Sequence, residues 1–310
     1  MYKDFAYIYD KLSFDLDYEK YADNIKNLVE KNSIKKDKML ELACGSGMLT
    51  NHFFDFYEKI DALDLSKSML EVFSNKYQKE NVSLYNYNMV DFQNENSYDL
   101  IVILLDSVNY ILDENDLKKL IKNSYKNLKK DGLLIFDINS EYKMKEVFGS
   151  KSYIYEYEDI FYTWDNIKDD DIIDMELNFF VENEDGSYQR IIENQVERYY
   201  SVGFMKNILK ENNFSDIEIF DEDDMGKLKD KTLRVLFKAK KEWKMEGKVK
   251  FFDDKKGYGF IESESGDYFF HYSEIISDKD YKTIENGANV EFDVKDLGRG
   301  DTAFNVKKRG

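Results

Sequence analysis

Cysteine, histidine and proline are scarce in this chain of 310 residues. It has one cysteine, two histidines and no proline. The single cysteine, Cys44, excludes an internal disulfide and a thiolate metal cluster. Because only His52 and His271 could add imidazole ligands, we expect no metal site. We expect Cys44 to pack inside a turn rather than to act as a nucleophile.

Positive charge and long apolar runs are also in short supply. The chain carries 45 Lys and Arg against 63 Asp and Glu, a formal net charge of -18. This balance disfavours nonspecific adhesion to nucleic acid or to an anionic membrane. No stretch has the length of a membrane span, and the N-terminus lacks the apolar core of a signal peptide. The expected compartment is the cytoplasm, with no membrane partner.

Residues 38–50, KMLELACGSGMLT, form the run that the first part of the chain is organised around. An apolar stretch, two glycines and a helix-like segment predict a buried strand, a tight turn and a helix N-terminus. Backbone N–H groups in such a turn can approach a nucleotide-like or carboxylate-bearing ligand. A dinucleotide fingerprint needs a third glycine where Thr50 stands, which weakens the pyrophosphate interpretation.

An acid comes early in this run. Glu41, Gly45 and Gly47 form E-x-A-x-G-x-G, and Asp64 ends the next apolar run, about 20 residues further on. This ordered set resembles motif I and the following acid of class I S-adenosylmethionine-dependent methyltransferases. The resemblance implies S-adenosylmethionine as cofactor, with its ribose hydroxyls on Asp64. The implied cofactor-binding residues are Glu41, Ala43, Gly45, Gly47, Asp64, Leu65, Met69, Asn88, Met89 and Leu105.

The adenine contact departs from that family's pattern. Members usually carry an acid where Asn88 stands, to accept a hydrogen bond from the adenine amino group. The side-chain oxygen of asparagine can accept the same bond without charge. Asp91 is a rival for this contact.

The order of the elements predicts the fold of the first domain, residues 1–240. Strands are expected over 60–64, 82–87, 98–105 and 133–138, and helices over 50–58, 68–78, 113–128 and 201–212. Segments 217–220 and 233–239 read as a closing antiparallel pair. This alternation builds a doubly wound, mostly parallel sheet, and the resemblance implies seven strands in a Rossmann-like arrangement.

Between residues 140 and 200 the period changes to that of strands, with a hairpin turn at residues 184–187. We expect an antiparallel β insertion that covers the active site and selects the methyl acceptor. Its composition is aromatic and acidic, which favours a neutral or cationic acceptor over a polyanion. The alternative is a β-layer whose aromatic side chains bury one another and whose acids face water.

Tyr9 and Asp106 are the catalytic candidates. Many small-molecule methyltransferases have a similar N-terminal Tyr-Asp segment that forms a lid, although these aromatics could also simply pack a helix onto the sheet. Asp106 follows the central strand, at the edge where such sheets bind ligands. It could instead only cap the following turn. The transfer has no obligatory general base.

Residues 245–310 form a second domain. They open with MEGKVKFF, and KGYGFI and YFFHYS resemble the two RNA-binding motifs of cold-shock domains, which implies a five-stranded oligonucleotide-binding barrel. Alternation places Tyr258, Phe260, Phe269 and His271 on one face, where bases of single-stranded RNA or DNA can stack. The candidate nucleic-acid-binding residues are Lys250, Phe251, Lys256, Tyr258, Phe260, Phe269, His271, Tyr272 and Arg299.

Three functions remain open from the sequence. The first is a methyltransferase for a small molecule, with the barrel as an accessory. The second is an RNA methyltransferase whose barrel delivers the substrate strand. Against it, the absence of proline removes the N/D-P-P-Y-type motif, and the position of Cys44 in motif I excludes the usual cysteine route to cytosine C5. The third is a non-catalytic RNA-binding protein that responds to S-adenosylmethionine.

Overall fold

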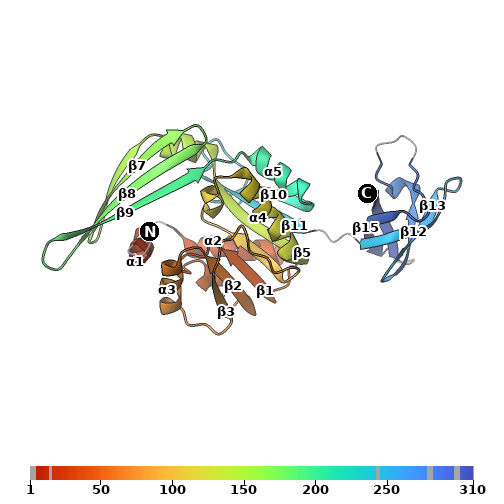
Figure 1. Ribbon diagram of the computed structural model, residues 1–310, viewed down its shortest axis with the longest axis horizontal. Coiled ribbons are helices and arrows are strands. Elements are labelled where there is room, and N and C mark those ends of the chain that lie inside the picture. Colours follow the sequence, from red (N-terminus) through yellow and green to blue (C-terminus); the bar gives the residue numbers. More distant parts are fainter. Residues whose placement is uncertain (1–4, 14–15, 242–244, 278–281, 297–300, 310) are drawn as a thin grey trace. The chain divides into compact units, whose positions relative to one another are not determined.

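The computed structural model describes residues 5–13, 16–241, 245–277, 282–296 and 301–309 (Figure 1). The chain divides into two compact units, Met1–Glu242 and Trp243–Gly310. None of the helices among the described residues is long and apolar enough to cross a membrane.

A seven-stranded sheet forms the centre of the first unit, in the order β10-β11-β5-β4-β1-β2-β3. The five strands β1 to β5 are parallel, and β11 runs antiparallel to both β5 and β10. The carboxyl ends of β4, β1, β2 and β3 therefore meet at one edge, which confirms the predicted fold class. The strands are β1 (Lys38–Leu42), β2 (Lys59–Asp64), β3 (Val82–Asn86), β4 (Tyr98–Ile103), β5 (Leu128–Asn139), β10 (Phe214–Asp221) and β11 (Arg234–Lys241).

Helices cover both faces of this sheet, and apolar side chains of two core clusters fill the layers between. Ser66, Asp113 and Ser201 cap three helices, each accepting a hydrogen bond from a backbone N–H of the first turn. The helices are α2 (Tyr18–Lys31), α3 (Lys67–Lys76), α4 (Glu114–Asn127) and α5 (Val202–Glu211), with short turns η1 (Thr50–Phe53), η2 (Ser107–Tyr110) and η3 (Lys143–Phe148).

Several expected boundaries are wrong. The strands expected over 217–220 and 98–105 are β10 (Phe214–Asp221) and β4 (Tyr98–Ile103), and two further differences have a clear physical reason. The helix expected over 50–58 is only the short 3-10 turn η1, because the Asn51 side chain donates to the carbonyl groups of Gly47 and Met48 and competes with helix formation. The strand expected to start at residue 133 already starts at Leu128. Asp131 takes a left-handed φ of 62°, so the chain bulges there instead of turning out of the sheet.

The insertion is a four-stranded antiparallel sheet, which we call the cap. One face of the cap packs against α1 (Phe5–Leu12) and α3, where Phe5 and Ile8 meet Phe179, Met69 and Val72 in a common core cluster. Figure 1 shows the cap strands extending past the central sheet, with α1 alongside. The strands are β6 (Ser152–Tyr157), β7 (Ile160–Asp169), β8 (Ile172–Glu182) and β9 (Tyr188–Arg198).

The second unit is a closed five-stranded barrel in the order β12-β13-β14-β16-β15, which confirms the predicted barrel. Its core holds Val249, Phe252, Ile261, Phe270 and Phe292. The strands are β12 (Met245–Asp253), β13 (Tyr258–Ser263), β14 (Gly266–His271), β15 (Asn289–Asp296) and β16 (Asp301–Lys308), with the turn η4 (Tyr272–Glu274).

Candidate cofactor and nucleic-acid sites

Two glycines in the turn after β1 have different structural roles. Gly47 has a φ of 81°, and a Cβ added to it would lie 2.7 Å from the ring of Phe73 in α3. Gly45 has a φ of 55°, and a Cβ there would meet nothing within 4 Å. Gly47 therefore lets the turn pack on α3, whereas Gly45 borders open space.

Asp64 ties the end of β2 to this turn. The Gly45 N–H donates to Asp64 Oδ2 at 2.9 Å, and the Ser66 N–H donates to Oδ1 at 2.7 Å. Burial raises the pKa of Asp64, and these two hydrogen bonds oppose the shift. Each carboxylate oxygen keeps a further lone pair, which can accept a hydroxyl proton from a ribose.

Glu41 carries a buried carboxylate that lacks a full set of partners. The residue is 3% exposed, and its Oε2 has no hydrogen-bond partner among the described residues. Burial raises its pKa to about 8. Together with Tyr9, Ala43, Gly45 and Leu105 it lines a small cavity of about 60 Å³. A buried carboxylate of this kind is stabilised by a nearby cation.

A hydrogen bond and ion pairs hold helix α1 over this cavity on both sides. Asp10 accepts a hydrogen bond from Ser46 of the glycine turn and pairs with Lys76 of α3. Lys11 Nζ pairs with Asp159 of the cap at 2.8 Å. Tyr9 faces the cavity, and burial raises the pKa of its hydroxyl.

Asp106 lies outside the set of residues that line the cavity. It pairs with Arg234 at 3.2 Å and accepts from Asn139 Nδ2 at 3.2 Å. Its backbone N–H and that of Leu105 donate to the buried Asp137, at 2.6 and 2.8 Å. Both Leu105 and Asp106 have a left-handed φ, of 56° and 57°. The network therefore holds the backbone of Leu105 against the cavity.

The remaining predicted cofactor residues lie away from the cavity lining. Leu65, 72% exposed, follows Asp64, and Met69 packs in the core between α3 and α1. Asn88 follows β3, and its Oδ1 accepts the Val90 N–H at 2.9 Å, with Met89 half-buried beside it. The rival Asp91 pairs with Lys119 at 2.5 Å.

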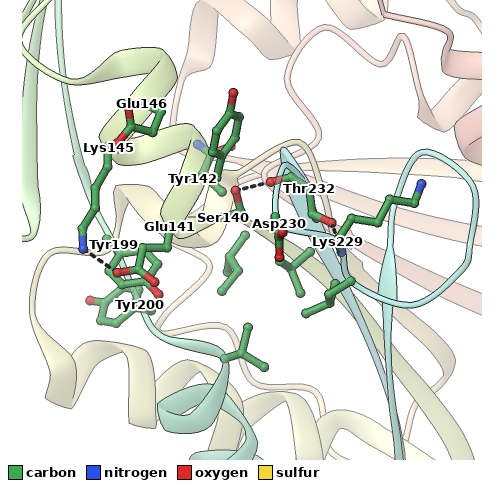
Figure 2. Close-up of a pocket in the computed structure, with 15 residues that line it drawn as sticks. Ser140, Glu141, Tyr142, Lys145, Glu146, Tyr199, Tyr200, Lys229, Asp230 and Thr232 are labelled. Atoms are coloured by element: carbon green, nitrogen blue, oxygen red, sulfur yellow. Dashed lines mark hydrogen bonds and ion pairs between the residues drawn. The ribbon is translucent and has the colours of Figure 1, made fainter.

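A larger pocket of about 480 Å³ opens beyond the ends of β5 and β11 (Figure 2). Two charged residues of its lining pair with each other, as Lys145 Nζ lies 2.5 Å from Glu141 Oε1. Asn139 lines this pocket and also hydrogen-bonds Asp106. The pocket shares no lining residue with the cavity of Glu41.

The barrel presents a continuous row of aromatic rings. Phe269 stacks on Tyr258 at 5.9 Å and meets Phe260 edge-on at 5.7 Å, and Phe251 meets Tyr258 at 5.9 Å. Strand pairing sets His271 opposite Tyr258.

Phe251 and Phe269 keep more than a third of their surface exposed, although their neighbours Phe252 and Phe270 fill the core. The exposed rings can therefore stack on bases.

Other predicted residues surround this row. Tyr272 is exposed and touches His271, with ring centroids 4.4 Å apart. Lys250 Nζ pairs with Asp267 at 2.6 Å, and Lys256 is exposed. Arg299 lies outside the described residues.

Sequence reasoning missed two buried acids on the cap strand β9, Glu193 and Glu197. In the printed sequence they alternate with Asn194 and Val196, which is typical of a strand with one solvent face. The contact of the cap with α1 shows that Glu193 points inward, and a hydrogen bond from Asn139 Nδ2 shows the same for Glu197.

The strand order, the glycine turn beside Asp64 and the barrel with its aromatic face define a class: a nucleoside-cofactor-binding α/β domain joined to an oligonucleotide-binding barrel. The family described as methyltransferase domain matches residues 39–132, and the 'cold-shock' DNA-binding domain matches residues 245–309.

Relatives agree with both matches. A provisionally named methyltransferase of Geobacillus sp. (strain WCH70) is 31% identical over 245 residues, 77% of this chain and 99% of its own. The crystal structure of an S-adenosylmethionine-dependent methyltransferase from Clostridium acetobutylicum ATCC 824 is similar with a TM-score of 0.72 at 34% identity, covering 78% of this chain and 99% of that one. Cold shock-like protein CspC of Bacillus cereus is 52% identical over 65 residues, 21% of this chain and 98% of its own.

The chain therefore belongs to the S-adenosylmethionine-dependent methyltransferases and carries a C-terminal cold-shock domain. This confirms the predicted enzyme class and the predicted cofactor.

The residues present fit that cofactor. The unpartnered carboxylate of Glu41 suits the positively charged methionine end, open space at Gly45 admits a ligand, and Asp64 can accept ribose hydroxyls.

Proposed function

We propose that this protein transfers the methyl group of S-adenosylmethionine to a small neutral or cationic molecule. The observation that carries the proposal is the roof over the cavity. Phe5 of α1 packs on Phe179 of the cap at 5.4 Å, and Tyr9 beside it lines the cavity. A small acceptor can reach such a covered site more readily than a folded nucleic acid.

The charge of the cap supports the same acceptor class. Residues 140–200 hold 16 acidic and 6 basic side chains. Such an excess of negative charge repels a phosphate backbone and attracts a cation.

Each part of the site has a task in this function. Glu41 and Asp64 hold the two ends of the cofactor, and Tyr9 with α1 excludes water. Bound S-adenosylmethionine supplies an electrophilic methyl group. Asp137 and Arg234 fix Asp106 and the backbone of Leu105, which borders the cavity. Positioning of this kind contributes of order 7 to 11 kcal/mol to barrier reduction in favourable cases.

The barrel, over residues 245–310, is in this proposal an accessory that binds single-stranded RNA or DNA through its aromatic row. The aromatic row of the barrel also favours a second candidate function, RNA methylation. A short tether raises the effective concentration of a bound strand near the other domain to about millimolar.

The test is methyl transfer from radiolabelled S-adenosylmethionine into total cellular RNA and, separately, into a small-molecule extract. We expect label in small molecules with the wild-type chain and none with Asp64→Ala. Label found only in RNA would contradict small-molecule methylation and would support RNA methylation.

A further inference from the structure

The inner face of the cap carries a buried acid with no evident structural task. Glu193 of β9 pairs with Leu177 of β8, so the two side chains share one face. Leu177 belongs to the core cluster that also contains Phe5 and Ile8 of α1. Glu193 therefore points toward α1, and it is only 1% exposed.

Glu193 is not satisfied within the described residues. Its Oε1 has no hydrogen-bond partner there. Burial raises its pKa to about 7, and the positive charge of the N-terminus opposes this shift. Glu197 on the same face differs, because its Oε2 accepts from Asn139 Nδ2 at 2.7 Å. Leaving a buried carboxylate unpaired lowers the stability of the fold. A ligand of opposite charge would remove that penalty.

Two segments that border the cofactor cavity contact the cap on either side of Glu193. On one side, Tyr9 meets Phe5 at 5.7 Å, and Phe5 packs on Phe179, two residues from Leu177. On the other side, the Tyr110 hydroxyl donates to Gln195 Oε1 at 2.9 Å, and Tyr110 follows closely after Ser107, which lines the cavity.

Aromatic side chains accompany the acid on this face. Trp164 lies on the same rung as Leu177 and Glu193, two strand spacings or about 10 Å from the acid. Tyr162 is its neighbour on β7, pairing with Phe179. Glu193 therefore shares the inner face with aromatic rings, and carboxylates and aromatic rings are the groups that bind an organic ammonium ion.

We propose that the acceptor is an amine and that Glu193 binds its ammonium group and takes one of its protons. This inference rests on the proposed small-molecule methyl transfer. Loss of the proton to the Glu193 carboxylate leaves a lone pair on the amine nitrogen. That lone pair forms the new bond to the methyl carbon as the carbon–sulfur bond breaks, and the bond's electron pair stays with sulfur. The methylated nitrogen then releases a second proton to water.

The experiment compares Glu193→Gln with Glu176→Gln, which removes an exposed acid on the outer face of the neighbouring strand. A small-molecule extract is separated into cationic, neutral and anionic fractions and incubated with radiolabelled S-adenosylmethionine. We expect label in the cationic fraction with the wild type and Glu176→Gln, and at least a tenfold lower rate with Glu193→Gln.

A second readout needs no cofactor. The indole N–H of Trp164 donates to Asn166 at 2.6 Å, and its NMR resonance reports on the inner face. Adding the cationic fraction should shift this resonance in the wild type and Glu176→Gln but not in Glu193→Gln. Unchanged affinity for S-adenosylhomocysteine would show that the variant is folded.

The outcomes separate the two proposals. Label confined to the neutral or anionic fraction, or a Glu193→Gln rate within twofold of wild type, overturns the amine proposal alone. Label confined to RNA overturns the proposed small-molecule function, and the amine proposal with it.

Discussion

At the scale of single residues, the cofactor site depends on backbone conformation as much as on charge. Gly45 is left-handed and borders the open side of the turn, so a branched side chain there would occupy ligand space and strain the backbone. We expect Gly45→Val to lower the affinity for S-adenosylmethionine at least tenfold, measured by calorimetry.

The matched control is Gly186→Val. Gly186 is also left-handed, and a Cβ there likewise meets nothing within 4 Å, but it lies in the hairpin turn between β8 and β9. Equal loss of cofactor affinity in both variants would show that backbone strain, and not the cradle at Gly45, is responsible.

Glu193 makes a prediction about stability that is independent of its ligand. Its folded-state pKa of about 7 lies above the ordinary value of 4.5, so the folded state binds more protons between these pH values. Stability therefore falls as pH rises through this window, by roughly 3 kcal/mol in total.

Glu193→Gln removes this contribution. We expect the variant to unfold at higher denaturant concentration than wild type at pH 8, with the difference vanishing near pH 4. A constant difference across this range would contradict the unpaired buried carboxylate.

Sequence patterns predict only one part of the site. Glu41, Gly45 and Asp64 follow a spaced motif, so the printed sequence is enough to find them. Glu193 belongs to no motif. Along β9, Ile191 and Ile192 point to opposite faces, so the two faces have similar hydrophobicity in the printed sequence. Which face is buried depends on α1, far away in the chain.

At the scale of elements, the proposed function assigns the closing of the site to α1. Asp10 joins it to the glycine turn through Ser46 and to α3 through Lys76. Asp10→Ala should speed amide hydrogen exchange in residues 5–12 and weaken cofactor binding severalfold. Lys11→Ala removes the exposed pairs with Glu158 and Asp159 and serves as the control, because exposed ion pairs contribute about 0 to 1 kcal/mol. Equal exchange in both variants would contradict a fastening role for Asp10.

The prediction of helices and strands succeeded where side-chain periodicity was strong. It failed where local hydrogen bonds determined the backbone conformation. The stripe of Leu117, Leu120 and Ile121 marks α4 clearly. The segment after Thr50 is equally apolar, but three Phe residues, Asn51 and His52 have low helix propensity, and the Asn51 side chain bonds the backbone. A single left-handed residue, Asp131, was enough to hide the start of β5.

At the scale of the whole molecule, two sites of different chemistry share one chain. The first holds the buried carboxylate of Glu41 in a covered cavity, and the second presents exposed aromatic rings on a barrel. Because each stacked base contributes about 1 to 3 kcal/mol, Phe269→Ala with His271→Ala should lower the affinity for single-stranded RNA at least tenfold. Fluorescence anisotropy with a labelled oligonucleotide measures this loss. An affinity within twofold of wild type would contradict binding through the aromatic row.

The most direct measurement is methyl transfer into a small-molecule extract by the full chain, comparing wild type with the Phe269→Ala, His271→Ala double variant. If the acceptor is a small molecule bound under the cap, the two rates should agree within twofold although the variant no longer binds RNA. A rate that falls together with RNA binding would contradict this account, because it would show that the barrel delivers the substrate.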